Sequence, residues 1–107
     1  MRFKYTREQD KVTFLRMMKA ELNTLAAKAS DLQVQKQILS LAETVGYSDP
    51  MSSEALEELE ERVKDNIALL GEELAENRTA DVTARIRKIQ SLWTERNEKC
   101  AVLKHRK

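Results

Sequence analysis

The chain has 107 residues, of which only two are glycine, one is proline, one is cysteine and one is histidine. This length suits one domain, and the shortage of glycine and proline leaves little material for loops. Charged residues make up 35% of the chain but the net charge is only +1, which indicates a solvated helical surface and excludes a disordered polyelectrolyte. One histidine and one cysteine exclude a zinc site and Cys-His or Ser-His catalysis, and two glycines exclude a glycine-rich phosphate loop. We therefore expect a protein without catalytic machinery or cofactor.

The first half of the chain is predicted to form two helices that meet near Ser30. Thr6 and Ser30 each begin a Ser/Thr-x-x-Glu/Gln capping box, so a helix should start near each of them. Apolar residues recur at helical spacing in both segments, but on one helical wheel those of 15–29 lie nearly opposite those of 34–45. A single straight helix would bury opposite faces in its two halves. We therefore predict a break between residues 27 and 32. Met17 and Met18 are separately expected to fill gaps in the core or at its edge.

The segment 46–53 is predicted to be the chain's substantial loop. Gly46 follows the second apolar stripe, where a left-handed cap commonly ends a helix. The next helix should begin with Pro50 in its first turn or with Ser52 or Ser53 as its N-cap.

The second half is predicted to form a long antiparallel helical hairpin, 53–76 against 80–104. Apolar residues repeat at helical spacing on both sides of an Asn77–Thr79 turn, and the net charge is −8 over 48–81 and +6 over 82–107. Opposite charges select the orientation more than they add stability, because each exposed pair contributes about 0–1 kcal/mol. The hairpin core should include Leu59, Val63, Leu70, Ile86, Ile89 and Trp93. The fold class is thus all-α, a small antiparallel bundle of about four helices in one domain, 1–107.

Three polar features of the hairpin have a structural and a functional interpretation. Arg96 falls on the apolar stripe of the last helix and should lie at the bundle edge, its stem covering apolar surface and its head reaching water or a glutamate. The alternative is a cation that binds a small ligand. Cys100 is expected to be a buried, inert core residue, and the alternative is a reactive thiol. The acidic run Glu54–Glu61 is interpreted as a solvated face near a helix N-terminus, and the alternative is a site for a cation or a basic partner.

The leading functional hypothesis is a protein–protein interaction module that forms a homodimer. Leu32 and Leu39 lie nearly opposite the core stripe of their short helix, and a helix that is apolar on two sides is either central or at an interface. Phe14 and Met17 flank the core stripe of the first helix and add to the apolar surface that one short bundle has little room to bury. Two-fold pairing with a second copy is the commonest solution. Tyr47 and Met51 are further candidates because loops on a rigid scaffold often carry function, unless they only close the end of the core. Arg96 completes the set of candidate interaction residues.

Two alternatives remain at the level of sequence. A nucleic-acid accessory protein would use the basic last helix, although such proteins usually have a strongly basic domain. A small-ligand enzyme would be built around Arg96. The chain has no apolar run of membrane-spanning length and no hydrophobic signal segment after its start, and a lone cysteine fits a reducing compartment. We expect a cytoplasmic protein with no membrane partner.

Overall fold

The computed structural model describes residues 7–104, and these form four helices without a β-strand. They are α1 (Arg7–Lys28), α2 (Leu32–Gly46), α3 (Glu54–Ala75) and α4 (Thr79–Lys104). The predicted all-α bundle is confirmed. Within the described part of the chain, none of the helices combines the length and the hydropathy that crossing a membrane requires.

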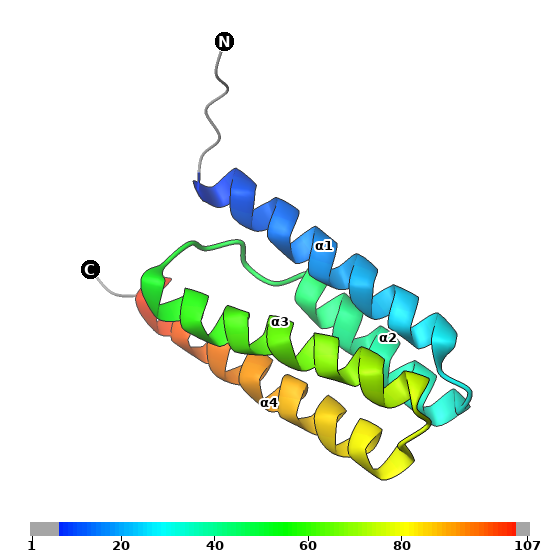
Figure 1. Ribbon diagram of the computed structural model, residues 1–107. Coiled ribbons are helices and arrows are strands. Elements are labelled where there is room, and N and C mark those ends of the chain that lie inside the picture. The colour runs from blue at the N-terminus through cyan, green and yellow to red at the C-terminus, as the bar shows by residue number, and fades with distance from the viewer. Residues whose placement is uncertain (1–6, 105–107) are drawn as a thin grey trace.

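The bundle consists of two helical hairpins laid side by side. The closest pairs are α1 with α2 and α3 with α4, while α1 also contacts α3 and α2 contacts α4. Around the bundle the order is therefore α1, α2, α4, α3. Figure 1 shows that α1 and α3 begin, and α2 and α4 end, at the same end of the bundle, where the segment between α2 and α3 crosses. We call this the loop end. The antiparallel pairing predicted for the last two helices is confirmed.

The predicted break in the first half is also confirmed, because α1 ends at Lys28 and α2 begins at Leu32. The residue that caps α2 is Asp31, one position later than the predicted Ser30. The Asp31 carboxylate accepts hydrogen bonds from the backbone N–H groups of Gln33 and Val34 at 2.7 and 3.1 Å. It thereby satisfies two of the backbone donors that a helix start leaves without a partner. The box at Thr6 lies outside the described residues.

The boundaries of the 46–53 loop differ in part from the prediction. Gly46 is the last residue of α2, and no described glycine has a positive φ, so the predicted left-handed cap is wrong. The absent side chain of Gly46 instead makes room for α1, because a Cβ built there would lie 2.7 Å from Cδ of Lys19. At the other boundary Ser53 is the N-cap of α3, as one of the alternatives predicted, and its hydroxyl accepts from the N–H of Ala55 at 3.3 Å.

One core runs through both hairpins and contains every side chain predicted for the hairpin interior. These are Leu59, Val63, Leu70, Ile86, Ile89 and Trp93, each at most 4% exposed. Met18 belongs to this core and Phe14 packs against it. Met17 is 66% exposed, so the prediction that both methionines fill core gaps is wrong for Met17. Met17 is one residue before Met18 and therefore about 100° around the helix from it.

Candidate interaction surface

Arg96 is the most deeply buried charged side chain among the described residues, with no exposed surface. Its Nε donates to Oε2 of Glu60 at 2.9 Å, its Nη2 to the backbone carbonyl of Asp49 at 2.6 Å and its Nη1 to Oδ1 of Asn97 at 2.9 Å. The guanidinium also lies 5.0 Å from the ring centre of Trp93. The predicted place at the bundle edge is therefore wrong, although the predicted glutamate partner is present.

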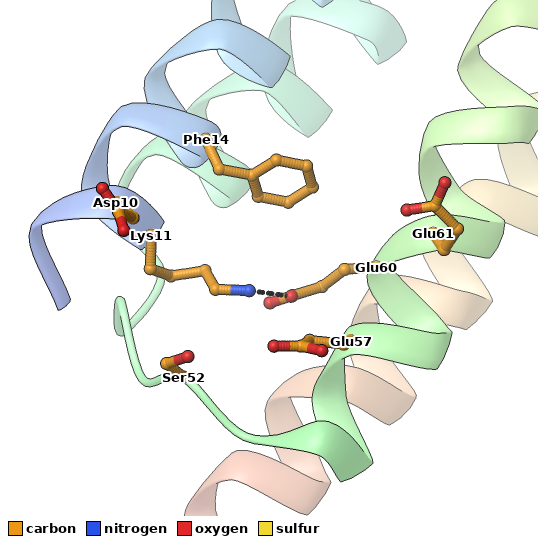
Figure 2. A pocket seen from close by; sticks show the side chains of 7 residues that line it. All are labelled: Asp10, Lys11, Phe14, Ser52, Glu57, Glu60 and Glu61. Carbon is orange, nitrogen blue, oxygen red and sulfur yellow. Dashed lines mark hydrogen bonds and ion pairs between the residues drawn. The ribbon is translucent and has the colours of Figure 1, made fainter. Parts of the chain in front are cut away.

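Glu60 holds a second cation from the other hairpin. Lys11 of α1 pairs with Oε1 of Glu60, whose side chain is only 2% exposed. Figure 2 shows the Lys11 chain extended from α1 toward this carboxylate on α3. The interpretation of the acidic run as a solvated face is thus wrong for Glu60, while Glu54, Glu57, Glu58 and Glu61 are exposed. We call Lys11, Glu60 and Arg96 the ionic cluster. Its contacts connect α1, α3, α4 and the loop.

An open hollow of about 400 Å³ lies over the ionic cluster. Its walls are Asp10, Lys11, Phe14, Ser52, Glu57, Glu60 and Glu61. Small-molecule sites are mostly apolar and enclosed, whereas this hollow is charged, and Lys11 and Arg96 both turn toward a carboxylate of the chain itself. The arrangement therefore acts as an internal clamp at the loop end.

The two loop candidates have different surroundings. Tyr47 is 85% exposed, with Nζ of Lys19 5.7 Å from its ring centre, so it does not close the core. Met51 is partly buried, and its Sδ accepts from the Cys100 thiol at 3.7 Å. Cys100 is buried as predicted, and this burial raises the pKa of its thiol. Met51 therefore closes the end of the core, and Tyr47 remains available on the surface.

Leu32 and Leu39 lie on the outer side of α2 and are 64% and 42% exposed. The exposed Lys36 and Glu43 share this side, because the steps of four, three and four residues keep all four within about 60° on the helix. We call Leu32, Lys36, Leu39 and Glu43 the outer stripe. The neighbouring helices leave it uncovered. Gln35 donates to the carbonyl of Ala26 in α1 at 3.2 Å, and Ser40, Leu41 and Thr44 face α4 across a small hollow.

Three of the six basic residues of α4 form ion pairs within the chain, while Arg87, Lys88 and Lys99 are exposed. Arg85 donates to both carboxylate oxygens of Glu73 at 3.1 and 3.0 Å and to Asn66 at 2.6 Å, and the hydrogen bonds with Glu73 raise the pKa of Arg85. Lys104 pairs with Asp49 at 2.7 Å, and Arg96 is buried. Residues 105–107, two of which are basic, lie outside the described part of the chain.

Glu60 and Glu73 are buried ion-pair partners that were not predicted, although the sequence contains a signal for both. Glu60 follows Leu56 by four residues and precedes Ile67 by seven, so it falls on the apolar stripe of α3. Glu73 follows Leu70 by three residues and therefore lies on the same side of the helix.

Comparisons of the chain with protein-family models, with curated proteins and with solved structures find no match.

Proposed function

We propose that this chain is a non-enzymatic protein–protein interaction module that associates with itself through the outer stripe of α2. The observation that carries the proposal is the exposure of Leu32 and Leu39, 64% and 42%, on a helix whose inner side is buried in the core. An exposed leucine alone is ordinary. Two leucines two turns apart form an apolar ridge of the kind that one helix offers to another.

The rest of the molecule supports a protein partner over the alternatives. Arg85, Arg96 and Lys104 make internal ion pairs, which leaves α4 fewer cations for contacts with phosphates. The cations of the ionic cluster are directed at Glu60, which favours a structural role over ligand binding. Met17 lies about 200° around α1 from Lys19, the residue against α2, so Met17 is outside the proposed surface.

Sedimentation equilibrium tests the proposal. The wild-type chain should sediment at about twice its 12.4 kDa mass at micromolar concentration, and Leu39→Glu should give the monomer. Leu69→Glu is the matched control, because Leu69 is 40% exposed against 42% for Leu39 but belongs to α3 and not to the outer stripe of α2. A wild-type chain that stays monomeric at high concentration, or equal effects of the two substitutions, would contradict the proposal.

A further inference from the structure

The charges of the outer stripe complement those of the same stripe reversed, because a cation, Lys36, lies on one side of Leu39 and an anion, Glu43, lies on the other. We propose that two copies pair antiparallel along α2, with the two-fold axis at Leu39, so that Lys36 of each copy lies opposite Glu43 of the other. This inference rests on the proposed function and specifies the geometry of the same surface. The partner it requires is a second copy of this chain, because the complementarity is within the stripe itself.

The spacing of the stripe supports this register. Lys36 is three residues before Leu39 and Glu43 is four residues after it. At about 1.5 Å per residue, a two-fold axis at Leu39 brings Lys36 and the second copy's Glu43 to within about 1.5 Å of the same level. Side chains of this length bridge such an offset easily. In a parallel pairing in register, Lys36 would instead face Lys36 and Glu43 would face Glu43, which repel.

The ends of the stripe also fit the antiparallel register. Leu32 is seven residues before the axis and Gly46 is seven after it, so each Leu32 reaches the second copy at Gly46, where the side chain of Lys19 fills the place of the missing side chain and the neighbouring Tyr47 is 85% exposed. The layers along the axis are therefore apolar, charged, apolar, charged and apolar. Leu39 packs on Leu39 at the centre, and the exposed ring of Tyr47 gives Leu32 an apolar surface to cover.

Lys36 and Glu43 are available for this pairing. Both are exposed, and neither forms an ion pair with another residue of the described chain, 7–104. No charged residue lies three or four positions from either of them in α2. Reversing either charge consequently disturbs no pair inside the chain, so an effect on dimerisation reports on the second copy.

Charge reversal gives the first test, read by sedimentation equilibrium. Lys36→Glu and Glu43→Lys should each weaken dimerisation by about tenfold or more, because either change turns two attractions into two repulsions. The double variant K36E/E43K should recover the wild-type dimer, and a mixture of the two single variants should form the heterodimer. Lys64→Glu, an exposed lysine of α3 without an ion pair in the described chain, is the control for net charge and should have no effect.

Cross-linking gives the second test, in a Cys100→Ala background. Leu39→Cys should form a disulfide between two copies, whereas Leu32→Cys should not, because an antiparallel pair separates the two Leu32 positions by about 21 Å. Efficient cross-linking at residue 32, or single charge reversals that leave the dimer constant unchanged, would overturn the register. If Leu39→Glu still abolishes the dimer in that case, the proposed function stands and only its geometry fails. A wild-type chain that stays monomeric would contradict both the proposed self-association and the antiparallel register.

Discussion

Glu60 and Arg96 form an ion pair that is buried almost completely, 2% and 0% exposed, with 2.9 Å between Oε2 and Nε. The two residues belong to different helices of one hairpin, and Lys11 joins them from the other. Burying such charges costs several kcal/mol of desolvation per ion, so the pair is a poor source of stability. Its geometric demand is strict, because any slip of α3 against α4 would leave a charge buried alone. The pair therefore fixes how α3, α4 and the loop meet.

Breaking this pair from one side should be costly. Glu60→Leu leaves Arg96 buried with only the neutral acceptors of Asp49 and Asn97 and removes the carboxylate that pairs with Lys11, so we expect a loss of about 3–5 kcal/mol in urea unfolding. The double variant Glu60→Leu/Arg96→Met should be more stable than Glu60→Leu alone, because no buried guanidinium remains. A double variant that is as unstable as the sum of the single changes would show that the two residues are not coupled.

Leu70 and Leu69 are neighbours on α3 with opposite surroundings, 0% and 40% exposed. Truncating the buried one removes packing contacts and leaves a cavity, so Leu70→Ala should cost about 2–5 kcal/mol in urea unfolding. Leu69→Ala is the matched control and should cost less than about 1 kcal/mol. An effect of Leu70→Ala below about 0.5 kcal/mol would mean that this side of α3 does not face the core.

The start of α2 gives a test of which residue caps it. Asp31→Ala should cost about 0.5–2 kcal/mol in thermal or urea unfolding, because the N–H groups of Gln33 and Val34 lose their acceptor. Ser30→Ala is the control and should be close to neutral, since Ser30 is exposed and precedes the cap. A larger loss of stability from Ser30→Ala than from Asp31→Ala would instead support Ser30 as the N-cap, as the capping box predicted.

The differences between the predicted and the observed structure concern features that local sequence patterns do not determine. Opposed apolar stripes were sufficient to predict the break between α1 and α2, and apolar spacing together with the opposite charges of the two segments predicted the hairpin and its core. They did not distinguish Ser30 from Asp31, because both side chains can cap and the choice depends on backbone dihedrals. The burial of Arg96 depends on Glu60, 36 residues earlier, and on how far α3 slides along α4. That register is a property of the packed bundle, which no local window contains.

The role of Gly46 also depends on packing between helices that the local sequence does not predict, and this role can be tested. A glycine in a left-handed cap would lose stability on substitution by alanine, but Gly46 is helical and has no positive φ. Its β-position is instead occupied by the side chain of Lys19. In a Lys19→Ala background, Gly46→Ala should therefore raise the free energy of unfolding by up to about 1 kcal/mol. Destabilisation by Gly46→Ala in that background, measured by urea unfolding, would support the left-handed cap.

The burial of Cys100 predicts a pH dependence of stability with a defined sign. Burial disfavours the thiolate and raises the pKa of Cys100 above its ordinary value, about 8.5. The unfolded chain then loses the thiol proton at lower pH than the folded one, so the contribution of Cys100 to stability is complete below about pH 8 and declines as the pH rises. Urea unfolding under reducing conditions should accordingly give a smaller stability difference between wild type and Cys100→Ala at about pH 9.5 than at about pH 7. The comparison cancels the titration of lysines and tyrosines, which both proteins share. A difference that is constant or grows with pH would mean that the Cys100 thiolate is solvated in the folded protein.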